Sequence, residues 1–175
     1  MTETVDVVVT YLERDLTSHG HPAVRAQPAA PGVALHRVLA PDAGDTAAML
    51  YRAVGAKWHW TDRLPWSAAE WDAAVNRDDV ELWVAQVDGE IAGYFELSIG
   101  CDAVELSYLG LMPEYTGRRL GTLLLNAAID RAAATTTPRM TVNTCTLDHP
   151  AALPNYLKGG FSIVRTVTQR RVIAP

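Results

Sequence analysis

The residues best suited to chemistry lie in a turn between a strand and a helix, within residues 105–129. This turn contains Gly117, Arg118, Arg119 and Gly121. Glycines let a backbone approach a ligand closely, the first turn of a helix has unpaired N–H groups with a partial positive charge, and arginines add fixed charge. The turn therefore favours a phosphate or pyrophosphate, although arginines at a helix start can also simply face water.

The elements on either side of this turn follow from the residue pattern. A short apolar run, Leu106–Leu111, ends at Pro113, which lacks an N–H and stops a strand. Beyond the turn, leucines and alanines recur at helical spacing between Leu120 and Ala128. The pattern predicts a buried strand, a ligand-binding turn and an amphipathic helix in direct succession.

Two segments resemble motifs of the GCN5-related N-acetyltransferases. Residues 113–124 are similar to the coenzyme A loop, Arg/Gln-x-x-Gly-x-Gly/Ala, with Thr116 at the Arg/Gln position, Arg119 at the first Gly and Gly121 at the last. Residues 149–161 are similar to Asn-x-x-Ala-x-x-x-Tyr-x-x-x-Gly-Phe. Ala152, Tyr156, Gly160 and Phe161 are in register there, and His149 replaces the Asn.

This resemblance implies an α/β fold, with a mixed, largely antiparallel central sheet splayed beside the coenzyme and helices on both faces. Residues 1–175 would form a single domain, in which residues 1–32 are an N-terminal extension with an extra strand and loop. The donor would be acetyl-CoA, with the amide of Leu109 facing the thioester carbonyl and the N–H groups of residues 117–122 holding the pyrophosphate. The implied coenzyme-binding residues are Leu109, Leu111, Thr116, Gly117, Arg118, Arg119, Leu120, Gly121, Thr122 and His149.

Tyr156 matches the tyrosine that donates to the coenzyme sulfur in this family, although it could instead be a core residue packed on Phe161. Glu105, eleven residues before Thr116, matches the glutamate base of the histone-type branch. A carboxyl group that enters an apolar strand has its pKa raised by desolvation, which would suit a base. Glu96, His149 or a chain of waters are alternatives to Glu105.

Two further features bear on substrates. Residues 57–71 contain four of the five tryptophans, and Trp58 and Trp60, together with Glu96, form a candidate acceptor pocket for a flat or cationic amine. The alternative is that these tryptophans anchor helices in the core. Cys145 could carry an acyl group, but no His–Asp arrangement accompanies it, which favours a structural thiol.

Composition bounds the remaining possibilities. A net charge of −5 argues against a nucleic-acid surface, and no apolar run is long enough to span a bilayer. Two cysteines and a Met1 segment without a basic n-region favour a cytoplasmic protein, and an Arg- and Ala-rich usage suggests a bacterial one. His19 and His21 lack further ligands, so no metal site is expected.

The rest of the chain reads as one core of alternating elements. Asp88-Gly89 is a hairpin signal, Ser67 and Glu70 form a capping box, and Pro154 predicts a late start or a kink in the last helix. The predicted further strands are Val5–Leu12, Val33–Leu39, Val80–Val87, Ile91–Ile99, Met140–Cys145, Phe161–Val167 and Gln169–Ile173. The Val5–Leu12 strand could pair within the chain or between the chains of a homodimer.

Together these features predict transfer of an acetyl group from acetyl-CoA to an amine by direct attack. The acceptor could be a small molecule or a peptide, and the acyl chain could be longer than acetyl. The departures at Thr116 and Arg119 motivate an alternative, a non-catalytic module of the same fold that senses an acyl-CoA or another small ligand.

Overall fold

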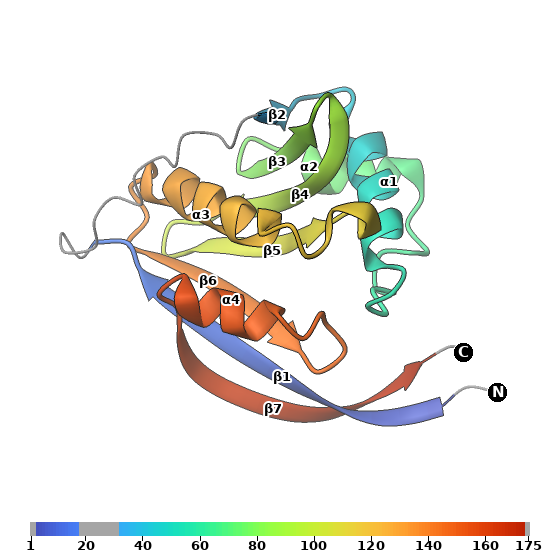
Figure 1. Cartoon of the computed structure of the whole chain (residues 1–175), viewed down its shortest axis with the longest axis vertical. Coiled ribbons are helices and arrows are strands. Elements are labelled where there is room, and N and C mark those ends of the chain that lie inside the picture. The colour runs from blue at the N-terminus through green and yellow to red at the C-terminus, as the bar shows by residue number, and fades with distance from the viewer. Residues whose placement is uncertain (1–2, 18–31, 174–175) are drawn as a thin grey trace.

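The computed structural model describes residues 3–17 and 32–173, which form a seven-stranded sheet and four α-helices. The sheet order is β2-β3-β4-β5-β6-β1-β7 (Figure 1). His19 and His21 lie outside the described residues. The elements are β1 (Glu3–Asp15), β2 (Val33–Val38), α1 (Ala43–Gly55), α2 (Ala68–Val75), β3 (Val80–Val87), β4 (Glu90–Ile99), β5 (Val104–Leu111), the 3₁₀ turn η1 (Pro113–Tyr115), α3 (Leu120–Ala133), β6 (Arg139–Cys145), α4 (Ala152–Lys158) and β7 (Ser162–Ile173).

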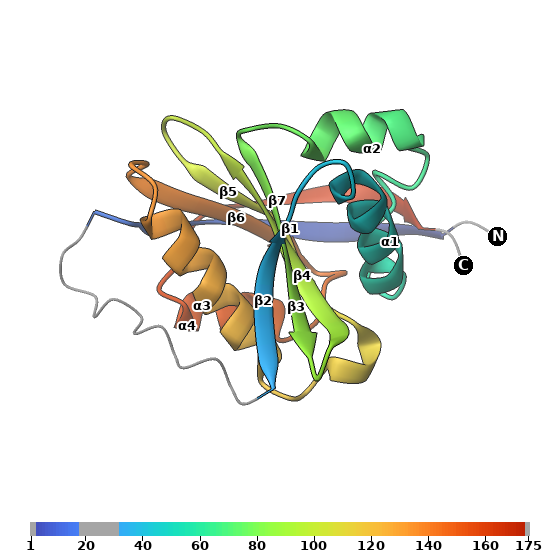
Figure 2. The same cartoon turned by 90° about the horizontal axis from the view of Figure 1, so that it is seen from above.

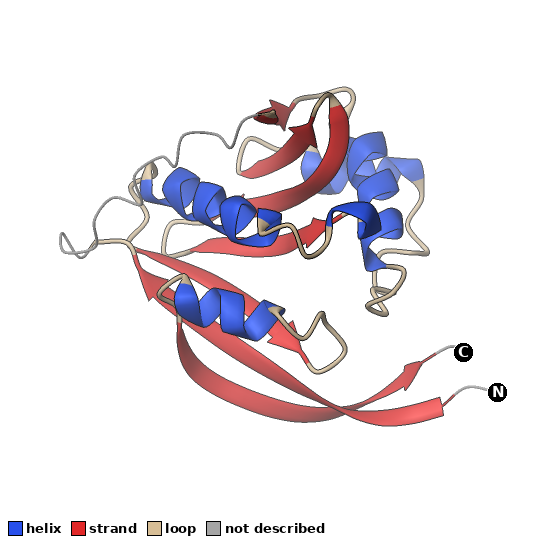
Figure 3. Cartoon of the chain, viewed as in Figure 1, coloured by secondary structure: helices blue, strands red, loops and turns tan. Residues whose placement is uncertain are grey.

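The expected mixed, largely antiparallel sheet with helices on both faces is confirmed. Every neighbouring pair of strands is antiparallel except β5 and β6. Figure 2 shows α1 and α2 on one side of the sheet and α3 and α4 on the other. Figure 3 shows the same layers coloured by secondary structure. None of the described helices is long and apolar enough to cross a membrane.

Each face of the sheet has its own apolar core, because alternate strand residues point to opposite faces. On one face, α3 packs Leu124 and Leu125 against Phe95 and Leu106 of the sheet. On the other, α1 packs Leu50 and Tyr51 together with Leu82 and Tyr94 of the sheet and Trp71 of α2. These two cores fix both helix layers against the strands that carry the candidate site.

The parallel strands β5 and β6 pair over only two positions, Val104 with Met140 and Glu105 with Thr141. Beyond these positions the two strands have no common hydrogen-bonded register. The sheet therefore opens from Leu106 onward, which is the splay that the sequence motifs implied.

The N-terminal strand β1 lies inside the sheet, antiparallel to both β6 and β7. The predicted Val5–Leu12 strand thus pairs within the chain. The two predicted C-terminal strands are one continuous strand, β7, so the expected break near Thr168 is wrong. Among the described strands, β7 pairs with β1 alone and therefore lies at the edge of the sheet. Its residues are exposed along almost its whole length.

Several local signals have the structural effect expected of them. Ser67 and Glu70 form a reciprocal capping box at the start of α2, and Asp88 and Gly89 both take positive φ in the β3–β4 turn. Helix α4 begins at Ala152, so Pro154 lies in its first turn, where a missing N–H costs little. Asp42 occupies the N-cap of α1, but its side chain makes no capping bond.

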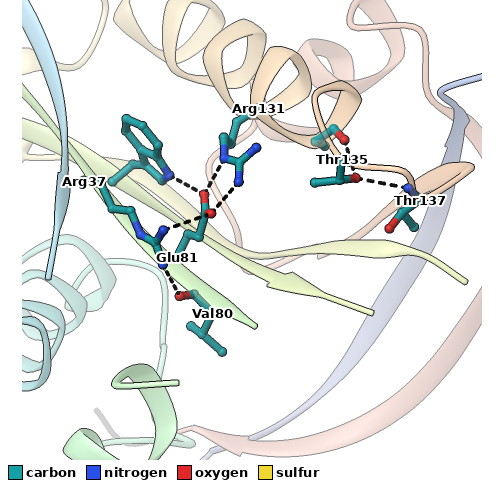
Figure 4. Close-up of polar contacts among 8 residues, drawn as sticks. Arg37, Val80, Glu81, Arg131, Thr135 and Thr137 are labelled. Carbon is teal, nitrogen blue, oxygen red and sulfur yellow. Dashed lines mark hydrogen bonds and ion pairs between the residues drawn. The ribbon is translucent and has the colours of Figure 1, made fainter. Parts of the chain in front are cut away.

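A buried carboxylate joins the sheet to α3. Glu81 on β3, with 2% of its side chain exposed, accepts from Arg131 of α3 at 2.6 and 2.7 Å and lies 3.3 Å from Arg37 of β2 (Figure 4). The indole N–H of Trp83 donates to the same carboxylate at 2.9 Å. Although desolvation opposes ionisation, these bonds together lower the pKa of Glu81.

Candidate active site

A cleft of about 1120 Å³ lies where β5 and β6 separate. Gly121, Asn155 and Tyr156 line it from the side of α3 and α4, whereas Trp60 and Asp62 line it from the side of α1 and α2. The cleft therefore passes through the opening in the sheet. The two faces of the sheet contribute different side chains to its walls.

One wall of the cleft is the unpaired edge of β5. The N–H of Met112 donates to the carbonyl of Ala92, at the end of the β4–β5 pairing. Because hydrogen-bonding directions alternate along a strand, the N–H and C=O groups of Leu111 and Leu109 point the other way, toward the cleft. Both residues line the cleft, and their backbone groups are available to an extended ligand.

The turn before α3 closes one end of the cleft. Arg119 is the N-cap residue and adopts a left-handed conformation with φ 62°, and Gly117 has φ 82°. A Cβ at Gly117 would meet no atom within 4 Å, and one at Gly121 would meet only Leu111, at 3.9 Å. The turn thus presents open backbone, and the first N–H groups of α3 have no acceptor within the helix.

Helix α4 is tied to this turn by Asn155. Its amide oxygen accepts from the Thr122 hydroxyl at 2.9 Å, and its amide nitrogen donates to the carbonyl of Gly121 at 3.2 Å. Tyr156 is the next residue in the chain. Asn155 therefore fixes the spacing between the start of α3 and the tyrosine, a role that no sequence signal indicated.

Tyr156 is 7% exposed and lies edge-on to Phe161, with ring centroids 6.0 Å apart. Its hydroxyl has no hydrogen-bond partner among the described residues, and the residue lines the cleft. Burial, followed by the charge of Asp148, raises the pKa of Tyr156 well above its usual value. The phenol is therefore protonated at neutral pH and can donate to a ligand.

The two candidate glutamates occupy different environments. Glu105 is at the last paired position between β5 and β6. It is exposed, lines the cleft and forms no ion pair with any described residue. Glu96 is 2% exposed and binds both guanidinium nitrogens of Arg63 at 2.9 Å. Glu96 does not line the cleft, so the geometry separates it from the acceptor side chains with which it was grouped.

A bulge in β5 sets the direction of the β5 side chains that face α1 and α2. Glu105 pairs with Ser98 of β4, Tyr108 pairs with Glu96, and Ser107 is left without an opposite residue. An extra residue shifts the alternation by one, so Glu105 and Tyr108 lie on the same face although they are three positions apart. That face carries α1 and α2.

The loop after α1 contacts the loop before α4 across the cleft. The indole N–H of Trp60 donates to Asp148, and the ring of Trp58 lies edge-on to His149 at 5.0 Å. Asp148 also accepts from the Thr144 hydroxyl at 2.7 Å and the Cys145 N–H at 2.8 Å. The Nδ1 atom of His149 accepts from the N–H of Ala151 at 3.0 Å.

Cys145 also lines the cleft. Burial, and then the Asp148 carboxylate, raise the pKa of Cys145 above its usual value. Because the thiolate is the nucleophilic form, this environment suppresses nucleophilicity. Within the described ranges no three His, Cys, Asp or Glu side chains converge as metal ligands.

The structure brings most of the residues expected from the sequence into one cleft. Three residues are exceptions: Glu96 pairs with Arg63, Arg118 stacks on Tyr115 at 5.1 Å, and Leu120 is buried in α3. The residues from the expected set that line the cleft are Trp58, Trp60, Glu105, Leu109, Leu111, Thr116, Gly117, Arg119, Gly121, Thr122, His149 and Tyr156. Asp62, Asp148 and Asn155 were missed as site residues. Of these three, only Asp148 could have been found from the sequence, because it stands just before the last predicted helix.

A splayed mixed sheet, a glycine-containing turn at the start of a helix and a cleft between them define an acetyltransferase-type architecture. The model of the acetyltransferase (GNAT) family matches residues 46–161, and the chain belongs to this family.

Individual relatives are distant. The GCN5-related N-acetyltransferase of Sphaerobacter thermophilus superimposes with a TM-score of 0.71 at 16% identity, over 99% of this chain and 54% of that one. The ribosomal-protein-S18-alanine N-acetyltransferase of Escherichia coli gives 0.62 at 16% identity, over 82% and 95%. At these identities the structures share the fold.

A protein of Bacillus subtilis (strain 168) is similar in sequence to part of the chain. It is named "Putative ribosomal protein bS18-alanine N-acetyltransferase" and is 29% identical over 68 residues, which are 39% of this chain and 45% of that relative. The chain thus spans about half the length of the Sphaerobacter protein and matches less than half of the Bacillus one.

Proposed function

We propose that this protein is an N-acetyltransferase that moves the acetyl group of acetyl-CoA to an amine by direct attack. The observation that carries this proposal is the Tyr156 hydroxyl. The residue is buried, its hydroxyl lacks a partner among the described residues, and it lines the same cleft as the free edge of β5 and the turn before α3. The hydroxyl oxygen keeps solvent contact, so a ligand atom in the cleft can replace water as the acceptor of its hydrogen bond.

The residues present fit the proposed donor. Open positions beside Gly117 and Gly121 let a pyrophosphate approach the N–H groups at the start of α3, and Arg119 adds a positive charge. The outward-facing N–H and C=O groups of Leu111 and the C=O group of Leu109 suit the amide groups of a pantetheine arm. When bound, the donor supplies an acetyl group activated as a thioester.

The chain supplies proton transfer and charge stabilisation. Glu105 is the candidate base that takes a proton from the acceptor ammonium, since an amine must be neutral to attack a carbonyl. The N–H of Leu109 is directed to stabilise the oxyanion that develops on the carbonyl, and Tyr156 gives a hydrogen bond or proton to the departing sulfur. The raised pKa of Cys145 supports attack by the amine itself rather than through an acyl-cysteine.

The acceptor class extends to small-molecule and peptide amines. Two similar proteins bear names that assign them to alanine acetylation of a ribosomal protein, which makes a peptide N-terminus one acceptor worth testing. Two free cysteines suit a reaction in the reducing cytoplasm.

The test is calorimetric titration of the purified chain with acetyl-CoA, followed by measurement of thiol release with a panel of amines and peptides. Binding and amine-dependent release are expected. Absence of binding would disprove the proposal, and an acetylated enzyme that accumulates in rapid quench would disprove direct attack.

A second candidate, an acyl-CoA sensor without turnover, is favoured by one observation. Arg119 places a Cβ and a long side chain in a turn of left-handed conformation, where the family motif has glycine. A sensor would bind acetyl-CoA with no amine-dependent thiol release from any acceptor. Its ligand-induced change in unfolding temperature would also survive replacement of Tyr156 by Phe.

A further inference from the structure

One carboxylate on the acceptor side of the cleft has no part in the chemistry described above. Asp62 lies in the loop between α1 and α2, is exposed, and lines the cleft. The Tyr51 hydroxyl donates to one of its oxygens at 2.6 Å and the Tyr108 hydroxyl to the other at 2.7 Å. Two donors from separate elements, α1 and β5, therefore hold the carboxylate in one orientation.

The two tyrosines serve as donors because they remain protonated. Burial raises the pKa of the Tyr108 hydroxyl well above its usual value, and it does the same for Tyr51. Partial burial opposes ionisation of Asp62, but the hydrogen bonds from Tyr51 and Tyr108 outweigh it, so that the pKa of Asp62 is lowered. Asp62 is consequently an anion throughout the neutral pH range.

Asp62 forms no ion pair with its neighbour in the chain, although the positive charge of Arg63 helps to lower the pKa of Asp62 from a longer distance. The Arg63 guanidinium turns away to pair with the buried Glu96, where it also stacks 4.4 Å from the Tyr108 ring. No Lys, Arg or His nitrogen of the described residues lies within ion-pair distance of the Asp62 carboxylate. Arg63 also lines the cleft, and the other cleft arginines and lysine, Arg119, Lys158 and Arg171, come from the α3 turn, α4 and β7.

Aromatic rings flank this fixed anion. The rings of Trp60 and Tyr108 lie 5.1 Å apart, and Trp60 lies 5.6 Å from Tyr51. Trp60 and Tyr108 both line the cleft. Arg63 already lies over the Tyr108 ring, so the carboxylate supplies the main attraction for an organic cation and the rings form an apolar wall beside it.

Asp62 is separated from the β5 backbone by the length of a tyrosine side chain plus one hydrogen bond, because Tyr108 reaches it from that strand. The reacting nitrogen must approach the backbone near Leu109 and must be uncharged there. A cation held at Asp62 is therefore a different group of the same acceptor.

We propose that Asp62 binds a second, non-reacting cationic group, so that the preferred acceptors are linear diamines or related small polycations. This inference rests on the proposed acetyltransferase function and names the substrate class of that site. It makes Asp62 a specificity-determining residue rather than a catalytic one.

The test compares binding of cadaverine, a linear diamine, with binding of pentylamine, the monoamine of the same chain length. Each is titrated calorimetrically into the full chain without an acetyl donor. Cadaverine should bind about tenfold more tightly, as expected of one charge-assisted hydrogen bond, and Asp62→Asn should remove that preference. Asp78→Asn, which removes an equal charge outside the cleft, should retain it.

Tyr108→Phe is a second variant in case Asp62→Asn does not fold. It keeps the carboxylate but removes one of the two hydroxyls that orient it, so the preference for cadaverine should decrease without disappearing. Equal binding of the two amines by the wild-type chain, or an undiminished preference in Asp62→Asn, would overturn the inference. Titration with acetyl-CoA is independent of both amines, so its failure would instead overturn the proposed function.

Discussion

The indole N–H of Trp60 lies 3.4 Å from Oδ1 of Asp148, a residue 88 positions further along the chain. The bond joins the loop after α1 to the loop before α4, across the part of the sheet where β5 and β6 no longer pair. Tertiary contacts between loops thus hold the open end of the cleft together where the sheet does not.

Replacement of Trp60 by Phe removes this bond and keeps an aromatic ring. We expect a loss of about 1 kcal/mol in unfolding free energy, typical of one hydrogen bond, and a several-fold increase in KM for the acceptor. KM for acetyl-CoA should not change, because the donor is proposed to lie along β5 and the start of α3. Trp58→Phe is the matched control, since its contact with His149 is between rings. An equal effect of both variants would show that the bond does not hold the cleft.

Replacement of Tyr156 by Phe removes the proposed proton donor. The ring remains packed on Phe161, so the unfolding midpoint in urea should change little. We expect kcat for thiol release to fall about 100-fold, within the range for loss of a general acid, with little change in KM for acetyl-CoA. Tyr11→Phe, a change on β1 outside the main cleft, is the control and should retain wild-type kcat. An unaltered kcat in Tyr156→Phe would remove the tyrosine from the mechanism.

Replacement of Arg119 by Gly relieves a left-handed conformation that costs a non-glycine residue about 1 kcal/mol. We expect unfolding free energy in urea to rise by up to about that amount, while KM for acetyl-CoA increases because a positive charge leaves the turn. Arg118→Gly removes an equal charge at a position without positive φ, so it should lower stability by about 0.5–1 kcal/mol. Destabilisation by Arg119→Gly would show that the turn is not strained.

Replacement of Glu105 by Gln tests the proposed base. We expect kcat/KM to fall about 100-fold for acceptors that are protonated at neutral pH, and less at high pH, where the amine is already neutral. The measurement is a pH profile of thiol release for both proteins. Glu90→Gln, an exposed change at the start of β4, should leave the profile unchanged. Profiles of Glu105→Gln and wild type that coincide at every pH would favour a water chain or His149.

The ion pairs of Glu81 predict acid sensitivity of the fold. The pKa of Glu81 in the folded chain is lowered from the ordinary value of 4.5. As pH falls, Glu81 is therefore protonated at a higher pH in the unfolded chain than in the folded chain. The stabilisation should be complete above about pH 4.5 and lost as pH falls through the lower, folded-state pKa. Urea denaturation at several pH values measures this loss.

The variant Glu81→Gln should weaken that part of the pH dependence. At neutral pH it should cost about 3 kcal/mol, because it leaves Arg37 and Arg131 without their shared carboxylate. Glu90→Gln is again the control for a lost surface charge. If the unfolding free energies of wild type and Glu81→Gln decrease equally as pH falls, other carboxylates cause the acid sensitivity.

Local signals in the sequence predicted local structure well. The capping box at Ser67, the hairpin at Asp88-Gly89 and the late start forced by Pro154 each depend on residues within one turn of each other. The strand–turn–helix around Gly117 was predictable for the same reason. Side-chain periodicity also assigned most strands, although it divided β7 in two.

Features that depend on distant residues were not predictable from one sequence. The position of β1 between β6 and β7 arises from pairings over more than a hundred residues. Likewise, the pairing of Glu96 with Arg63 and the anchoring of Asp62 by Tyr51 and Tyr108 require knowledge of which faces meet. The sequence therefore indicated the donor side of the cleft, which is built on one motif, better than the acceptor side, which is assembled from several elements.

The interior position of β1 also determines the order in which the protein can fold during synthesis. Glu3–Asp15 leaves the ribosome before the other described strands and helices, yet its partners Arg139–Cys145 and Ser162–Ile173 are made only after β2 to α3. Until then β1 has neither neighbour, whereas the β3–β4–β5 meander and α1 to α3 can already pack. Because pairings of long sequence separation form slowly, β6, β1 and β7 should assemble as the final and rate-limiting step.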